Sequence, residues 1–261
     1  MARKEKTADP RTHNDRVGLM VTRGQVMTEE GHGTLQTRMF FDNSRNIIAF
    51  GSSQRSREPG NPLTSDQKRR ALYSLWGDSF KMIFLQDIGA TDRNSDWADY
   101  VLDRIRSNQL PEPTDLYAGS IHDARWYEGM FAPLSGEPSY KRGEFAVWEN
   151  AHTGKRIHIH DRYANPRAVS SSAVRDLIER RDPSWKNFVP ARLWEFYEWE
   201  YPPELRVAVE WPDADLPGPD RFPLGTKLLP AGSRDVLILR DDGKWRPRTA
   251  AEMANAKSLG D

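Results

Sequence analysis

The stretch VGLMVT at Val17–Thr22 decides the fold class of this chain. It is a short, continuous apolar run, which is typical of a strand buried on both faces of a parallel sheet. Helical patterns separate it from three similar runs at residues 46–50 (NIIAF), 81–86 (KMIFLQ) and 115–118 (DLYA). Strands that alternate with helices predict an α/β, Rossmann-like fold with a doubly wound parallel sheet, which binds ligands at the carboxyl ends of its strands.

One of the intervening helices has a local sequence signal at its start. TSDQ at residues 64–67 has the pattern of a capping box and predicts a helix that continues to about Gly77. A second helix is expected near residues 95–107.

The alternation breaks at residues 126–168. The runs at 144–148 and 156–159, joined through HTGK, predict an inserted β-hairpin. Beyond Pro190, ARLWEFYEW predicts a helix, and VAVEW and DVLILRDDGKW predict strands. We therefore expect a disordered, solvated tail at 1–16, a main domain at 17–190 that contains the insertion, and a C-terminal helix with a small β-rich extension at 191–261. The extension would serve as a cap or as the contact of a homo-oligomer.

Composition excludes several classes of function. The 261 residues include 38 Lys and Arg against 38 Asp and Glu, so no overall field attracts nucleic acid or an anionic membrane. The chain has no cysteine, which excludes disulfides, thiolate catalysis and cysteine-type zinc sites. No apolar run approaches the length of a membrane span. We expect a soluble, cytoplasmic protein without nucleic-acid or membrane partners.

The segment VSSSAVR at 169–175 has the pattern of a helix start that binds phosphate. The first turn of a helix leaves backbone N–H groups unpaired and carries the positive end of the helix dipole. Serine hydroxyls add donors, and Arg175 adds a charged fork that matches phosphate geometry. The alternative is an ordinary serine N-cap, with Arg175 paired to Glu179 one turn further on.

GSSQRSREPGNPLTSDQKRR at residues 51–70 resembles the GSAQxSxxxxNPFTxxER signature of nicotinamide mononucleotide (NMN) adenylyltransferases of the archaeal and phage or Nudix-associated type. These belong to the nucleotidyltransferase superfamily marked by (H/T)xGH and ISxTxxR motifs. QDI at 86–88, Trp97, Gly119-Ser120 and VSSSAVR follow in the family's order, so the resemblance covers about residues 17–190. It implies transfer of AMP from ATP to NMN, giving NAD and pyrophosphate.

The first motif departs from the family. GRFQPFHxGH corresponds to TRGQVMTEEGH at 22–32, which has one extra residue and lacks the first histidine. Relatives with TxGH place threonine there, so Thr28 can substitute. Two carboxylates beside a triphosphate would oppose its binding, and we therefore expect the turn to bulge so that Glu29 and Glu30 point to solvent. The arginine that usually precedes NPFT is replaced by Gly60, and Arg55 or Arg57 could reach the same phosphates.

The resemblance also implies roles for individual residues. His32, Arg175 and Thr28 would be catalytic, with His32 donating to the α-phosphate and Arg175 holding the β- and γ-phosphates. ATP and its phosphates would contact Arg23, Gln25, Gly31, Gly51, Ser52, Ser53, Arg57, Gly119, Ser170, Ser171 and Ser172. Asn61, Asp87 and Trp97 would bind NMN, with Asp87 on the nicotinamide amide and Trp97 stacked on its cationic ring. Mg²⁺ would arrive with ATP and bridge its phosphates through water, so no protein metal site is predicted.

Structural interpretations compete with these roles. His32 could be a solvent-facing histidine in a glycine-flanked turn, Asp87 a strand-end cap, Trp97 a core residue and Asn61 an Asx-turn. His158 and His160 alternate along a strand and could reach a metal, but such a pair is more often the polar face of a hairpin. The run WEFYEW at 194–199 has helical spacing and is interpreted as core.

Two further functions remain open from sequence. The acceptor could be another phosphate monoester, such as nicotinate mononucleotide, phosphopantetheine or a sugar phosphate. Alternatively, the chain could be a regulatory protein that binds NAD or ATP and has lost the chemistry. The altered first motif and the C-terminal extension motivate this second alternative.

Overall fold

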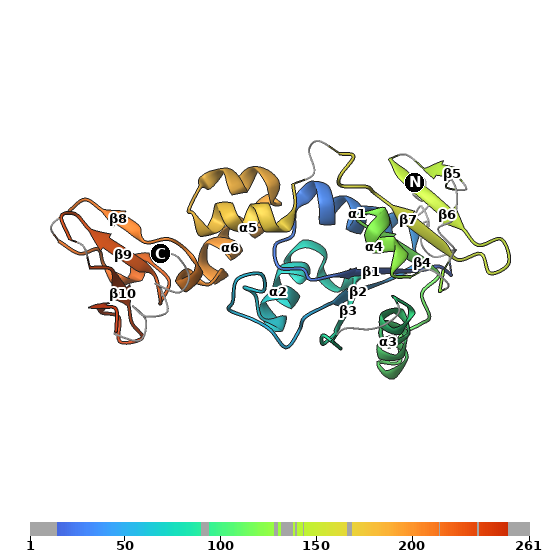
Figure 1. Cartoon of the computed structure of the whole chain (residues 1–261), viewed down its shortest axis with the longest axis horizontal. Coiled ribbons are helices and arrows are strands. Elements are labelled where there is room, and N and C mark those ends of the chain that lie inside the picture. The colour runs from blue at the N-terminus through green and yellow to red at the C-terminus, as the bar shows by residue number, and fades with distance from the viewer. Residues whose placement is uncertain are drawn as a thin grey trace, which may run out of the picture.

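A seven-stranded sheet organises the larger part of the molecule, with strands in the order β3-β2-β1-β4-β7-β6-β5. The structure is a computed structural model and describes residues 15–89, 94–127, 130–131, 138, 140–142, 144–165, 169–213, 215–233 and 235–249. The strands are β1 (Val17–Thr22), β2 (Arg45–Phe50), β3 (Lys81–Phe84), β4 (Asp115–Ala118), β5 (Tyr140–Arg142), β6 (Phe145–Glu149) and β7 (Arg156–Ile159). Figure 1 shows this sheet and a second, smaller sheet at opposite ends of the molecule.

The strands expected from apolar runs form the parallel part of the sheet. In the pairing of β1 with β2, Val17 lies opposite Arg45 and Thr22 lies opposite Phe50. β2 pairs in parallel with β3, and β1 pairs in parallel with β4. The side chains of β4 and the last five of β2 are buried, as expected for strands covered on both faces. The Rossmann-like α/β fold predicted from the sequence is confirmed.

The hairpin predicted in residues 126–168 is present, but it is an integral part of the main sheet. Its strands β6 and β7 pair antiparallel, with Ala146 opposite Ile159. β7 also pairs in parallel with β4, so it is the fifth parallel strand of the sheet. Ile157 and Ile159 are buried as a result. Part of the 126–168 segment lies outside the described residues.

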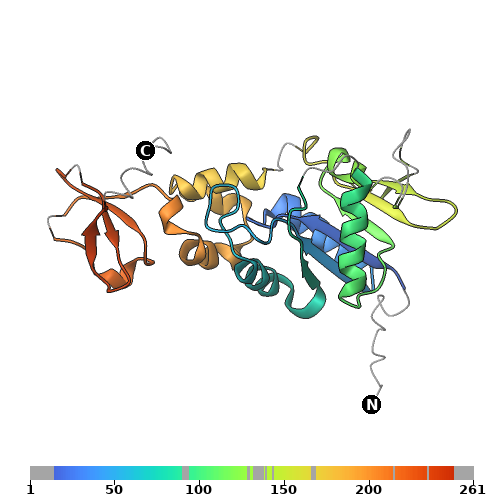
Figure 2. The ribbon, with the colours of Figure 1, turned by 60° about the horizontal axis from the view of Figure 1, so that its bottom comes forward.

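Helices cover both faces of the sheet. They are the π-helical turn η2 (Glu29–Gly33), α1 (Thr34–Asp42), α2 (Ser65–Trp76), α3 (Asn94–Ser107), α4 (Ile121–Arg125), α5 (Ser171–Glu179) and α6 (Trp194–Glu200), with short 3₁₀ turns η3 (Gly77–Ser79), η4 (Pro183–Phe188), η5 (Ala191–Leu193), η6 (Pro203–Leu205) and η7 (Pro219–Arg221). One core cluster joins β1 and β2 to α1, α2, α5 and α6. The other joins the sheet to α3 and α4, and Figure 2 shows α3 lying across the strands.

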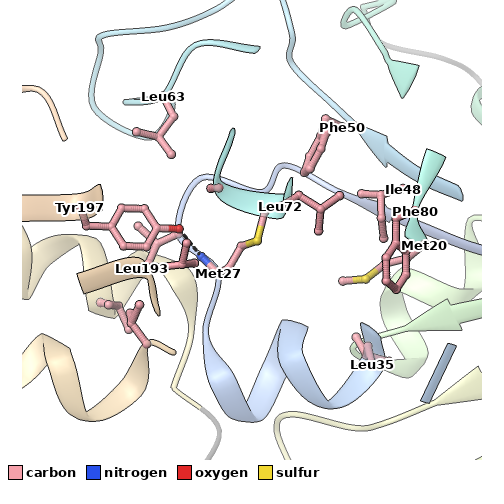
Figure 3. Packing of buried hydrophobic residues seen from close by; sticks show 14 of the residues in the cluster. Met20, Met27, Leu35, Ile48, Phe50, Leu63, Leu72, Phe80, Leu193 and Tyr197 are labelled. Carbon is pink, nitrogen blue, oxygen red and sulfur yellow. Dashed lines mark hydrogen bonds between the residues drawn. The ribbon is translucent and has the colours of Figure 1, made fainter. Parts of the chain in front are cut away.

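The first core cluster reaches the loop that follows β1. Met27 is buried there beside Leu72 and Leu193 (Figure 3). Its backbone N–H donates to the hydroxyl of Tyr197 at 2.9 Å. Tyr197 is the fully buried member of the WEFYEW run, whereas Trp194 and Trp199 are exposed, so the interpretation of that run as core holds only in part. α6 thus fixes the loop from which the candidate site is built.

The C-terminal extension is a separate four-stranded sheet in the order β11-β10-β9-β8. Its strands are β8 (Val209–Trp211), β9 (Lys227–Pro230), β10 (Leu237–Leu239) and β11 (Trp245–Pro247). The edge-to-face ring contacts of Phe222 with Trp211 and Trp245 help to hold it together. This confirms the predicted β-rich appendage; residues 250–261 lie outside the described residues.

The predicted tail is wrong at its last residue. Arg16 was expected in a solvated segment, but its guanidinium pairs with buried Asp115 at 2.6 Å, and its carbonyl accepts from the N–H of Ser44. The physical reason is that Asp115 begins the neighbouring strand β4 and needs a partner once it is buried. Residues 1–14 lie outside the described residues. In the described part of the chain, no helix has the length and apolar character needed to cross a membrane.

Candidate functional site

The candidate site lies where β1, β4 and β7 end. Thr22 ends β1, Gly119 follows β4, and Arg162 follows β7 after two further residues. The N–H of Arg162 donates to the carbonyl of Gly119 at 3.0 Å, which ties the last two loops together. This is the edge of a parallel sheet at which α/β folds bind ligands.

The extra residue of the first motif is accommodated by a π-helical turn. Thr28 precedes the turn, and the N–H of Gly33 donates to its carbonyl at 3.0 Å. A π-turn holds one residue more than an α-turn and is frequent at functional sites. Glu29 and Glu30 are exposed on it, so their predicted orientation to solvent is confirmed. Gly31 packs tightly, because an added Cβ would lie 2.6 Å from the Thr28 hydroxyl oxygen.

The geometry around His32 determines which ring nitrogen holds the proton. Nδ1 lies 3.3 Å from both the backbone nitrogen and the hydroxyl of Thr28, and Nε2 lies 3.0 Å from the hydroxyl oxygen of Thr22. A backbone N–H can only donate, so Nδ1 accepts and the neutral ring holds its proton on Nε2. Burial and, secondarily, the charge of Arg162 lower the pKa of His32 to about 4. His32 is therefore a neutral donor at pH 7 and is not a solvent-facing side chain.

The start of the 51–70 segment, called the phosphate loop below, is joined to Asp87 by hydrogen bonds. Ser52 has a positive φ of 52°, and its hydroxyl donates to Asp87 at 2.8 Å. The loop is further fixed by the ammonium group of Lys68, which is fully buried and donates to the carbonyl of Gly51 at 3.3 Å. Burial lowers the pKa of Lys68 to about 8, with an opposing effect of Asp87 and a further lowering by Arg23. The structure thus brings these predicted site residues together around Lys68.

Ser53 takes part through its backbone, since its N–H donates to the carbonyl of Leu85 at 2.9 Å. The sequence interpretation missed Lys68. A lysine among the buried positions of α2 is the signal that could have found it, because a buried ammonium group needs polar partners.

Three predicted ligand contacts are engaged within the protein. The side chain of Gln25 donates to that of Asn61 at 3.2 Å and accepts from the N–H of Leu63 at 2.9 Å. Both Gln25 and Asn61 are buried. Arg57 forms an ion pair with Glu204 at 2.6 Å, which joins the phosphate loop to the segment before the C-terminal sheet. These contacts shape the loops around the site.

The serines of α5 also have partners in the protein. Ser170 accepts from the N–H of Ala173, so the serine N-cap interpretation is confirmed for this residue. The hydroxyl of Ser171 donates to the carbonyl of Val26 at 2.6 Å, which places the start of α5 beside the first motif. Arg175 donates to the hydroxyl of Ser172 at 3.1 Å. The start of the helix that carries Arg175 thus lies beside the first motif.

Arg175 was alternatively expected to pair with Glu179. The structure gives Glu179 a different partner, because it accepts from the hydroxyl of Tyr201 at 2.5 Å. Arg175 is partly exposed.

The two residues expected to bind the nicotinamide ring differ in their surroundings. Asp87 is exposed and follows β3. Trp97 is partly buried against the second core cluster, where its indole N–H donates to the hydroxyl of Tyr127 at 3.3 Å. Its ring lies 5.6 Å from that of Tyr100. Trp97 is therefore partly a core residue, as the structural interpretation of this tryptophan predicted.

His158 in β7 and His160 directly after it are buried and do not form a polar hairpin face. His158 is buried against Asp115 at 2.8 Å and stacks on Tyr117 with ring centres 4.4 Å apart. His160 is buried and stacks on Phe145. The polar-face interpretation is wrong because both rings are buried and stack on aromatic side chains of the neighbouring strands, Tyr117 of β4 and Phe145 of β6. In the described ranges, no group of three or more metal-ligating side chains is found.

Arg162 is a residue that the sequence interpretation missed. Its guanidinium contacts Asp123 of α4 at 3.1 Å. Its positive charge also helps to lower the pKa of His32. The signal that could have found it is a basic residue shortly after a buried strand. It was missed because the strand before Arg162 was interpreted as part of an inserted hairpin outside the site.

Comparison with known proteins adds no family to this picture. A scan against models of protein families finds no match, and no curated protein is significantly similar to the chain. The functional argument therefore rests on the motifs and on the geometry.

Proposed function

We propose that this chain is an adenylyltransferase that transfers AMP from ATP to NMN, giving NAD and pyrophosphate. The observation that carries the proposal is His32, which holds a neutral Nε2–H donor at the carboxyl end of β1. The positive charge of Arg162 helps to keep this ring neutral. The hydrogen bond of Ser171 to Val26 holds the start of α5, the helix of Arg175, beside the same loop. A donor beside arginines suits the phosphates of a nucleotide.

The reaction needs no nucleophile from the protein. A phosphate oxygen of NMN forms a bond to the α-phosphorus of ATP, and the bond to the bridging oxygen of the β-phosphate breaks as pyrophosphate leaves. Negative charge builds on the α-phosphate oxygens in between, and catalysis consists of positioning and charge stabilisation. His32 exchanges its bond to Thr22 for one to an α-phosphate oxygen. Because it is already neutral with the proton on Nε2, it requires no change of protonation at pH 7.

Mg²⁺ is proposed to enter with ATP. When bound, it would neutralise charge on the phosphates. This mode needs no cluster of carboxylates from the protein.

The choice of NMN as acceptor rests on Asp87 and Trp97. Asp87 is exposed after β3 and is held by Ser52, so its second carboxylate oxygen can accept from the nicotinamide amide. Trp97 follows on α3 and offers an indole face to a cationic ring. An aliphatic acceptor would have no use for this pair.

A panel of acceptors tests the proposal. Purified protein with Mg²⁺ and either ATP or CTP is given NMN, nicotinate mononucleotide, phosphopantetheine or a sugar phosphate, and pyrophosphate release is measured. We expect release with ATP and NMN together. Release with a different acceptor and none with NMN would show that this other acceptor, and not NMN, is the substrate.

The role of Arg175 is tested in the same assay with Arg175→Ala. Arg180→Ala is its matched control, because Arg180 is exposed at the end of the same helix and pairs with Asp176.

A second candidate is a nucleotide-binding regulatory protein. The observation that favours it is that Gln25 and Asn61 bond to each other and Arg57 bonds to Glu204, which leaves fewer groups for substrates. Calorimetry with ATP and NAD, run beside the turnover assay, separates the two candidates. Tight binding without pyrophosphate release from any acceptor would favour the regulatory protein.

A further inference from the structure

Arg162 occupies a defined position above the end of β4. Its Nη1 lies 3.1 Å from a carboxylate oxygen of Asp123, and its Nη2 donates to the hydroxyl of Tyr163 at 3.3 Å. The guanidinium passes over Gly119, where an added Cβ would lie 3.1 Å from Nη1. Gly119 therefore leaves the space that this arginine uses.

The same position adjoins the first motif. Leu35, three residues after His32, has a methyl carbon 3.9 Å from the Cβ position of Gly119. The proximity of Arg162 and His32 is also evident in the pKa of His32, which the positive charge of Arg162 helps to lower. Arg162 and His32 thus face one region at the carboxyl edge of the sheet.

Stability alone does not account for this arginine. The ion pair with Asp123 is partly exposed, and pairs of this kind contribute about 0–1 kcal/mol. A guanidinium has five N–H donors, of which Asp123 and Tyr163 use two in the bonds described above. The remaining donors and the charge suit a second, multiply charged anion.

We propose that Arg162 is a second arginine of the nucleotide site and binds the pyrophosphoryl portion of ATP, with Asp123 as its positioning residue. This inference deepens the proposed function and rests on it. Arg175 approaches the phosphates from the start of α5, and Arg162 approaches from the loop after β7.

Pyrophosphate is the probe, because it carries the recognised group and needs no acceptor or turnover. Isothermal titration of the full chain with Mg²⁺-pyrophosphate compares the wild type with Arg162→Gln and Arg162→Lys. Loss of a hydrogen-bonded charge should weaken binding on the order of 10- to 100-fold in Arg162→Gln. Arg162→Lys should fall between, since it keeps the charge and loses the fork. Arg125→Gln is the control, because Arg125 is exposed on the same helix as Asp123.

A double-mutant cycle separates binding from a general structural effect. Gly119→Ala keeps Arg162 but places a methyl group against its guanidinium, and should weaken pyrophosphate binding several-fold. In the Arg162→Gln background the same change should have almost no further effect, because the group that it displaces is gone. Additive losses in the double variant would show that Gly119 acts independently of Arg162 and would overturn the placement.

The outcomes for this site and for the proposed function are distinguishable. Wild-type pyrophosphate affinity in Arg162→Gln, or no pyrophosphate binding by the wild type, overturns the inference about Arg162. Arginine-dependent pyrophosphate binding without nucleotidyl transfer to any acceptor overturns the proposed enzyme and supports the anion site. NAD synthesis with an unchanged KM for ATP in Arg162→Gln supports the enzyme and overturns the site.

Discussion

His32 should make the stability of this protein depend on pH in a way that one substitution removes. Its pKa is lowered from 6.5 to about 4 in the folded chain, first by burial and then by the charge of Arg162. Below pH 6.5 the unfolded chain therefore takes up a proton that the folded chain does not bind. The free energy of unfolding must fall as the pH is lowered from 6.5 toward 4.

The size of the effect follows from the two pKa values. At pH 5 the imidazole is mostly charged in the unfolded chain and mostly neutral in the folded one, which costs the folded state about 2 kcal/mol relative to pH 7.5. Protonation of Nδ1 would also break the bond from the Thr28 N–H, because that bond exists only while Nδ1 is unprotonated. His32→Asn keeps an acceptor in place of Nδ1 and cannot titrate.

The assay is urea unfolding at pH 7.5 and 5.0, followed by tryptophan fluorescence. Wild type should lose about 2 kcal/mol more than His32→Asn between the two pH values, whatever the offset between the variants at pH 7.5. His122→Asn removes an exposed histidine and should keep the wild-type dependence, because His32 is still present. Equal pH dependence in wild type and His32→Asn would refute the placement of His32 as a partly buried, neutral ring.

Three further predictions concern turnover and folding. Arg175→Ala should lower the turnover of NAD synthesis about a hundredfold or more, since it removes transition-state stabilisation of a few kcal/mol; unchanged synthesis would reject its role. Replacing Glu29 and Glu30 together by glutamine should leave the KM for ATP nearly unchanged in steady-state kinetics, because both are exposed, whereas His32→Ala should lower turnover strongly. A loss in the double glutamine variant that extra Mg²⁺ cannot restore would place the carboxylates in the site. Thr64→Ala should destabilise the chain by about 1 kcal/mol in urea unfolding by removing the capping box of α2, and an unchanged midpoint would contradict this.

Local patterns predicted the local parts of the fold. β1 and β4 have the bounds expected from their apolar runs, and α2 begins after Thr64 with both hydrogen bonds of the capping box. The physical reason is that burial on two faces and the first turn of a helix each leave a signal within a few residues. The strand expected at 81–86 ends at Phe84, because the chain there leaves the sheet for the loop with Asp87.

Long-range pairing could not be predicted in the same way. Nothing near β7 shows that it pairs with β4, some forty positions earlier, and without that pairing Arg162 looks like part of an insertion. Likewise, the family resemblance implied ligand contacts for Gln25 and Asn61. Their mutual hydrogen bond satisfies both amides inside the protein and depends on two loops that meet only in the fold. The roles of the site residues in binding ATP and NMN stay predictions.

The π-turn reconciles an altered motif with a conventional fold. One residue inserted before α1 would rotate every following side chain by about 100° if the helix stayed regular. Leu35 and Met39 would then leave the core in which they are now buried. Closing the turn from Gly33 to Thr28 absorbs the residue before α1 begins, so the apolar face of α1 stays on the sheet and His32 stays between Thr22 and Thr28. The turn therefore leaves Glu29 and Glu30 exposed while the His32 ring lies at the end of β1.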